Sequence, residues 1–253
     1  MSERHWQRPA LASTALALLG ATAVAGCGGP ASTSRAGTSQ ASTSQASATH
    51  AAGVATATGR AQSLTAAQLK GALLTKVGTA RPAAPAEAGD YGALPDVQTS
   101  KQTKHGVTVT PARCARATVA GFNSAAFTHA PASVVTFRVG RDGVSEVLVS
   151  ATPDVAQSAL GNKLPAGCEH YTASVGGKTY HYSVKQSPIA GLGNEARALN
   201  VKAAGYSQVN VWSVVYRADG FVGAVTVVGP DASQASAKKL ASQAYAYARQ
   251  SLS

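Results

Sequence analysis

Apolar and polar residues alternate in two neighbouring stretches in the second half of the chain, and this pattern predicts a pair of β-strands. The stretches are Val134 through Val139 and Val144 through Ser150. Gly140-Arg141-Asp142-Gly143 lies between them, and Asp-Gly often supplies the positive φ that a tight hairpin turn requires. Pro153-Asp154 follows, and we expect a helix to begin there because Asp and Pro are typical of helix starts.

The same order of elements returns seventy-seven residues later. Val209 through Tyr216 and Phe221 through Val228 flank the turn Arg217-Ala218-Asp219-Gly220. Pro230-Asp231 then leads into a final helix, which we expect to span Asp231 to Ser251. A duplicated unit of hairpin and helix would explain the match, and so would independent use of common turn chemistry. The sequence leaves both explanations open.

A third hairpin is predicted between the two copies. Gly176-Gly177 separates His170 through Val175 from Lys178 through Val184, so a two-residue loop sets the register of the pairing. One face then carries Tyr171, Ala173, Val175, Tyr180 and Tyr182, and the other carries His170, Thr172, His181 and Ser183. We expect the tyrosine face to form core or the wall of a cleft, because tyrosine buries a large ring and keeps a polar tip.

Helical spacing appears at three other places. Leu64 to Leu74 predicts a short helix with Thr65 as its N-cap, and Ala112 to Ala126 predicts a second. The final helix presents a stripe of mostly small residues, namely Ala237, Leu240, Ala241, Ala244, Tyr247 and Ala248. Gly78 to Thr110 has no sustained period, and we expect it to be irregular. The fold class is therefore α+β, with a mainly antiparallel sheet of about six or seven strands covered on one face by helices.

The N-terminus has the pattern of a bacterial lipoprotein signal peptide over residues 1–26. Arg4 and Arg8 precede an uncharged stretch from Ala10 to Ala23, and Val24-Ala25-Gly26-Cys27 follows. The stretch is too short to span a bilayer stably. In lipoproteins that this segment resembles, the cysteine is diacylglycerylated and becomes the new N-terminus, so Cys27 is predicted to be a lipid anchor. An ordinary secretory signal cleaved near the same place is the alternative.

Residues 27–61 are predicted to form a flexible tether, and residues 62–253 the exported domain. The tether contains mainly Ala, Ser, Thr, Gly and Gln, which cannot bury enough apolar surface to fold. Random-coil scaling gives it a reach of about 30 Å. The boundaries predict a single folded domain held close to a membrane.

The charge of the chain restricts its partners. The formal net charge is +11, and loss of Glu3, Arg4 and Arg8 with the signal peptide leaves 20 basic and 10 acidic side chains. Anionic lipid headgroups and acidic wall polymers are the candidate partners outside the membrane, and nucleic acid is not expected there. The basic residues are scattered, so a plain solvated surface is the alternative interpretation.

Two cysteines remain after Cys27, and they predict a disulfide. Cys114 and Cys168 form an even pair in an exported chain. A redox-active pair is the alternative, but the two do not form a Cys-x-x-Cys motif.

No catalytic, metal or cofactor motif emerges. His170 and His181 share a strand face at a distance that a metal could bridge, but no third ligand accompanies them. Gly191-Leu192-Gly193-Asn194 lacks the lysine of a phosphate-binding loop and is better explained as a bend before a strand. The sequence therefore predicts no cofactor and no enzyme activity.

The order of these features resembles the PknH-like extracellular sensor domain family of actinobacteria. The resemblance rests on Leu73-Leu74-Thr75, the two cysteines, Gly191-Leu192-Gly193-Asn194-Glu195-Ala196 and the terminal hairpin and helix. It implies an antiparallel sheet flanked by helices around a cleft. The family's kinase-attached members have two disulfides, whereas this chain has cysteines for one. Exported lipoproteins of the Mog1/PsbP-like fold are a second resemblance of the same architecture.

The resulting hypothesis is a lipid-anchored extracytoplasmic domain that binds a small molecule, lipid or wall fragment. Its candidate ligand-binding residues are Tyr171, Tyr180, Tyr182, Arg197 and Trp212. Ordinary core packing is the alternative for the aromatic residues. A different function, as an adaptor that contacts another envelope protein through a sheet edge or the segment from Gly78 to Thr110, also remains open.

Overall fold

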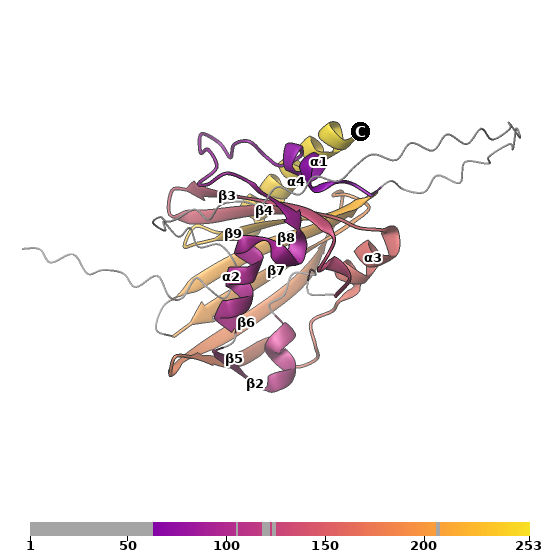
Figure 1. The fold of residues 1–253 in the computed structure, drawn as a ribbon. Helices are drawn as coiled ribbons and strands as arrows, with labels where there is room; N and C mark the ends of the chain where they lie inside the picture. Colours follow the sequence, from indigo (N-terminus) through magenta and orange to yellow (C-terminus); the bar gives the residue numbers. More distant parts are fainter. Residues whose placement is uncertain (1–62, 105, 118–121, 123–124, 206–207) are drawn as a thin grey trace, which may run out of the picture. The chain divides into compact units, whose positions relative to one another are not determined.

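The computed structural model describes residues 63–253, except 105, 118–121, 123–124 and 206–207 (Figure 1). The predicted signal peptide, Cys27 and the tether lie outside these residues. None of the described helices combines the length and the apolar character that crossing a bilayer requires.

One antiparallel sheet of nine strands organises the domain, in the order β1-β3-β4-β9-β8-β7-β6-β5-β2. The strands are β1 (Glu87–Asp90), β2 (Val107–Thr110), β3 (Pro131–Val139), β4 (Asp142–Ser150), β5 (His170–Val175), β6 (Lys178–Ile189), β7 (Glu195–Ala204), β8 (Val209–Ala218) and β9 (Phe221–Val228). The three predicted hairpins are all present, and β1 and β2 add the two edges (Figure 1).

The described part of the chain also contains α-helices and short 3₁₀ helices. These are α1 (Ala66–Gly71), α2 (Pro95–Lys104), α3 (Pro153–Gly161), α4 (Gln234–Leu252), η2 (Tyr91–Ala93), η3 (Ala112–Arg116) and η4 (Ala125–Phe127). Thr65 caps α1 through a capping box with Gln68, as the sequence predicts. Ser233 caps α4 in the same way, so this helix begins three residues after the predicted Asp231.

The α+β class is confirmed, but several details of the prediction are wrong. The sheet has nine strands because the segment expected to be irregular contains β1 and β2. That segment also contains α2, which crosses in front of the sheet in Figure 1. Between Ala112 and Ala126 the described residues form 3₁₀ turns, with Cys114 in the first.

Helical elements cover both faces of the sheet, and not one face as expected. On the face that we call the α4 face, α1 and α4 pack on β3, β4, β9 and β8, with Leu69, Leu148, Val214 and Ala241 fully buried. On the opposite face, called the α3 face, there are two apolar clusters. One includes Leu160 of α3 with Val215 and Val222, and the other includes the tyrosines of β5 and β6.

The two repeated hairpins are similar in pairing but different in their turns and helices. The first turns at Gly140-Arg141, where Gly140 has φ +60, so Asp142 and Gly143 begin β4 instead of forming the turn. The second turns at Asp219-Gly220. Val147 pairs with Ala224, which is its equivalent seventy-seven residues later, so the two hairpins meet about a local two-fold axis. The helices break this symmetry, because α3 and α4 pack on opposite faces.

Candidate functional site

The tyrosine hairpin has the predicted register. Val175 pairs with Lys178 around Gly176 and Gly177, whose φ values are +54 and +75. Tyr171 therefore lies directly opposite Tyr182 on the α3 face. The glycines allow this two-residue loop because both positions lie in the left-handed region.

Tyr171 and Tyr182 stack in parallel, with ring centroids 4.9 Å apart and an interplanar angle of 2°. Tyr180 lies on the same face opposite Ala173, and the three tyrosines are only 6–7% exposed. Burial, with a smaller contribution from Tyr180, raises the pKa of Tyr182 to about 12. The three rings thus form a packed apolar wall.

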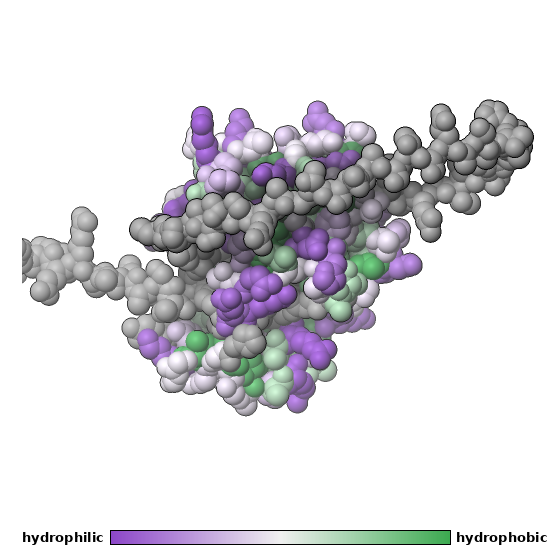
Figure 2. All heavy atoms as spheres, in the orientation of Figure 1, coloured by the Kyte–Doolittle hydropathy of each residue, from purple (hydrophilic) through white to green (hydrophobic). Residues whose placement is uncertain are grey.

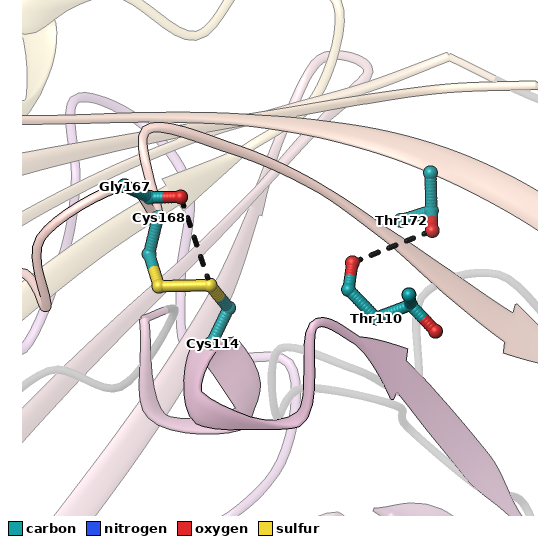
Figure 3. Close-up of a disulfide and its surroundings, with 5 residues drawn as sticks. All are labelled: Thr110, Cys114, Gly167, Cys168 and Thr172. Atoms are coloured by element: carbon teal, nitrogen blue, oxygen red, sulfur yellow. Dashed lines mark hydrogen bonds between the residues drawn. A yellow bond between two sulfur atoms is a disulfide. The ribbon is translucent and has the colours of Figure 1, made fainter.

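A disulfide closes one end of this cluster. Cys114 in η3 is bonded to Cys168, with the Cα atoms 5.4 Å apart, and both cysteines are fully buried (Figure 3). The carbonyl oxygen of Gly167 lies 4.0 Å from Cys114 Sγ. Nearby, the hydroxyl of Thr172 donates to the carbonyl oxygen of Thr110, 3.5 Å away (Figure 3). The predicted disulfide is confirmed, and it attaches the chain around β2 to the start of β5.

Arg197 lies on the α3 face but is occupied by α3. Its guanidinium donates to the carbonyl oxygens of Ala159, Leu160 and Asn162, the first at 2.7 Å. These are carbonyl groups at the end of the helix, which a cation stabilises. Burial lowers the pKa of Arg197, and the neighbouring Glu195 carboxylate opposes this change. Because the guanidinium of Arg197 is hydrogen-bonded to the end of α3, it is not available to bind an anion.

Trp212 is on the other side of the sheet. It lies opposite Asn200 and Val227 and packs against the apolar cluster beneath α4. The structure therefore brings together Tyr171, Tyr180 and Tyr182 but separates Trp212 from them. One cleft cannot be lined by all five residues proposed from the sequence.

Little in the tyrosine cluster points to bond-making chemistry. Within the described ranges, no group of three His, Cys, Asp or Glu side chains is arranged to hold a metal ion. His170 and His181 share the α4 face, opposite the tyrosines, as the predicted register requires. What the cluster can present to a ligand is the small exposed part of these rings and their phenolic hydroxyl groups.

Sequence reasoning missed a polar pair under α1 and α4. Glu146 is 1% exposed on the α4 face of β4, and its Oε2 accepts a hydrogen bond from the backbone N–H of Leu74 at 2.8 Å. Its Oε1 has no hydrogen-bond partner, and neither has the hydroxyl of the fully buried Tyr216. The sequence did contain a signal for this, because Glu146 lies two residues from Val144 and two from Leu148 and so shares their inward-facing side of the strand.

Both members of this pair favour their protonated forms. Burial raises the pKa of Glu146 to about 7, against the lowering effect of the Leu74 hydrogen bond. Burial also raises the pKa of Tyr216 well above its ordinary value, with smaller contributions from Glu146 and Tyr245.

The ring of Tyr216 occupies the space that a side chain at residue 223 would need, since a Cβ on Gly223 would lie 2.3 Å from Tyr216 Cζ.

The glycine-rich segment before β7 is a bend, as predicted, and it contacts a neighbouring turn. The backbone N–H of Asn194 donates to the carbonyl oxygen of Arg217 at 2.9 Å, and its amide donates to Asp219 at 2.8 Å. Leu192 is buried between two glycines with positive φ. These hydrogen bonds hold the segment against the β8–β9 turn, and the segment does not form a phosphate-binding loop.

Two solved structures of mycobacterial proteins are similar to this chain. No protein-family model and no curated protein matches the chain. The extracellular domain of PknH from Mycobacterium tuberculosis has a similar structure, with a TM-score of 0.52 and 15% sequence identity over 75% of this chain and 98% of that chain. A putative uncharacterized protein from Mycobacterium smegmatis, an Rv0999 ortholog, shares 17% identity over 57% of this chain and 77% of its own, with a TM-score of 0.39. The first similarity confirms the antiparallel sheet flanked by helices that the resemblance implied.

Proposed function

We propose that this chain is an extracytoplasmic lipoprotein whose domain is a non-catalytic, sensor-like binding module. The observation that carries the proposal is the shared fold with the PknH extracellular domain, which the similarity covers almost completely. That domain works outside the membrane as part of a larger protein. In this chain, attachment would come from the lipid on Cys27.

The disulfide supports an oxidising compartment. Cys114 and Cys168 are buried and bonded to each other, and such bonds persist outside the cytoplasm. The pattern of residues 1–27 supplies an export signal that agrees with this compartment. Export and the disulfide are therefore independent indications of the same location.

The anchor is tested on the full chain expressed in an actinobacterial host. We expect the protein in the membrane fraction, with an N-terminal peptide that begins at an acylated Cys27 by mass spectrometry. Cys27→Ser should abolish acylation, whereas Ser32→Ala, five residues further on, should not. An unmodified N-terminus in the unsubstituted protein would contradict the anchor.

The binding proposal concerns the tyrosine cluster, and native mass spectrometry of protein purified from the host envelope tests it. We expect a small molecule or lipid that is released on denaturation. Its occupancy should fall in Tyr180→Phe/Tyr182→Phe, while Tyr247→Phe on α4 serves as the control. A mass equal to that of the mature acylated chain with its disulfide, and nothing else bound, would contradict ligand binding.

The adaptor function has less support. Among the described residues, Val139 is the one large hydrophobic side chain that is exposed, at 37%, so no apolar docking patch is evident there. The edge strands β1 and β2 have four residues each, and short edges discourage pairing with another chain.

A further inference from the structure

The α4 face is only partly covered. α1 and α4 pack over β3, β4, β9 and β8, and the contact of Gln234 with Ser187, 3.5 Å apart, marks where α4 meets β6. Beyond it, the α4-face positions of β2 and β5 are all Ser, Thr or His. The side chains of His170, His181, Lys185 and Lys202 are exposed there.

These four basic residues surround one hydroxyl. Ser183 on β6 lies directly opposite His170 on β5 and directly opposite Lys202 on β7. His181 and Lys185 are two residues before and after it on the same strand, so they share its face. Neighbours across the strands have Cβ atoms about 5 Å apart, and those along a strand about 7 Å. We call this group the Ser183 cluster.

The charge of the Ser183 cluster is not neutralised by the fold. Among the residues that the structure describes, neither Lys185 nor Lys202 belongs to an ion pair. Glu195 on β7 lies on the α3 face, where its carboxylate pairs with Arg217, and Glu169 precedes His170 outside the paired positions of β5. A further lysine, Lys238, is one helical turn from Gln234 on the exposed side of α4. The surface therefore attracts anions with no competing carboxylate in the cluster.

The shape of this surface selects the kind of anion. Small ligands need a concave site that buries most of their surface, whereas here the side chains stand on an open sheet. Phosphates spread over a plane match basic and hydroxyl groups spread over a plane. A bilayer containing anionic phospholipid has that arrangement, and the predicted lipid on Cys27 would hold the domain close to it.

We propose that the Ser183 cluster docks on the phosphate headgroups of an anionic phospholipid bilayer. Lys185 and Lys202 supply the charge, and Ser183, His170 and His181 donate hydrogen bonds to phosphate oxygens. The domain then lies with its α4 face toward the membrane and its α3 face, which carries the tyrosines, toward the outside. This orientation rests on the proposed anchor, because a tethered domain needs only weak affinity to remain docked.

The test uses residues 28–253, which include every described element but lack the cysteine that carries the lipid. Sedimentation with vesicles of phosphatidylglycerol and phosphatidylcholine should recover the protein, and vesicles of phosphatidylcholine alone should not. Lys185→Gln/Lys202→Gln should weaken binding roughly 30-fold, from about 1 kcal/mol for each lysine. Binding should also be lost in 0.5 M salt, since screening shortens the range of the attraction.

Lys76→Gln/Lys163→Gln is the matched control, because it removes the same charge from two exposed lysines in loops outside β5, β6 and β7. Equal weakening in both variants would mean that net charge alone is responsible, and it would overturn the proposal. Failure to bind anionic vesicles would also overturn it, as would binding only to a soluble polyanion such as polyglycerol phosphate. Because the protein tested has no anchor, these results are independent of whether Cys27 is acylated.

Discussion

At the scale of single residues, the buried carboxyl group of Glu146 is in an unfavourable environment. It has one hydrogen bond, from Leu74, and an oxygen without a partner beneath α1 and α4. A carboxylate in such surroundings loses its hydration without full compensation. The protein therefore tolerates Glu146 best when a proton neutralises it.

This conflict predicts that stability falls as pH rises. Burial raises the pKa of Glu146 from 4.5 to about 7, so the folded protein holds more protons than the unfolded chain between these values. The stabilising proton is fully present below about pH 4.5 and is lost through pH 7. We expect Glu146→Gln to remove on the order of 3 kcal/mol of this pH dependence.

Urea unfolding at a series of pH values from 5 to 8 measures the effect, with the exposed Glu169→Gln as the control. The same slope in Glu146→Gln and in the unsubstituted protein would show that this carboxyl is not responsible.

A second residue-scale prediction compares two glycines of one bend. Gly191 and Gly193 both have positive φ, but a Cβ on Gly193 would lie 2.3 Å from the carbonyl oxygen of Arg217, whereas one on Gly191 would meet open space. Gly191→Ala should cost about 1–2 kcal/mol for the left-handed backbone. Gly193→Ala should cost distinctly more, because the backbone of the β8–β9 turn must move. Thermal unfolding of the two variants compares them directly, and equal midpoints would contradict the expectation.

At the scale of elements, the helix α3 depends on a residue of the strand β7. The guanidinium of Arg197 donates hydrogen bonds to three carbonyl groups at the C-terminal end of α3. Arg197→Met keeps most of the apolar stem and removes these charged hydrogen bonds, so we expect a loss of about 2 kcal/mol. Amide exchange should quicken in α3 more than in α4. Arg138→Met, at an exposed position of β3, is the control, and an unchanged α3 in Arg197→Met would refute the role.

The elements that the sequence predicted well are those with a strong period and clear turn residues. The β5–β6 hairpin has the expected loop, register and faces because Gly176-Gly177 leaves few other choices. By contrast, β1 reads Glu-Ala-Gly-Asp and α2 has Val97 as its sole large apolar residue, so neither has a pattern of its own. They form because β3 and the apolar cluster on the α3 face supply partners.

The candidate site shows the same division. Alternation placed the three tyrosines on one face correctly, because that requires only the hairpin's own register. The separation of Trp212 from them depends on how β6, β7 and β8 pair, and the short-range pattern does not contain that information. Lys202 was missed as a neighbour of Ser183 for the same reason, whereas Lys185 was missed because the predicted strand ended at Val184 and β6 extends to Ile189.

At the scale of the whole molecule, we expect the disulfide to stabilise the strands near it more than the distant ones. Cys114 and Cys168 are 54 residues apart, and closing a loop of this length contributes about 4 kcal/mol in the chain-entropy model. Cys114→Ser/Cys168→Ser should lower stability by up to that amount and loosen β2 and β5 first. The β4–β9 pair should stay protected, because its core includes neither cysteine. Hydrogen exchange of the double variant tests this, and uniform loosening of all nine strands would contradict it.

The meeting of the two repeated hairpins has the form of an isologous dimer interface within a single chain. Val147 on β4 pairs with its own counterpart on β9. Residues on either side of it pair reciprocally, so that Val144 lies opposite the counterpart of Ser150, and Ser150 lies opposite the counterpart of Val144, as in a symmetric homodimer. At the axis itself, a perfect repeat would oppose two copies of one side chain. The chain has Val147 there against Ala224, a large residue against a small one. Whatever the origin of the repeat, the axis is the position where the two halves have most reason to differ.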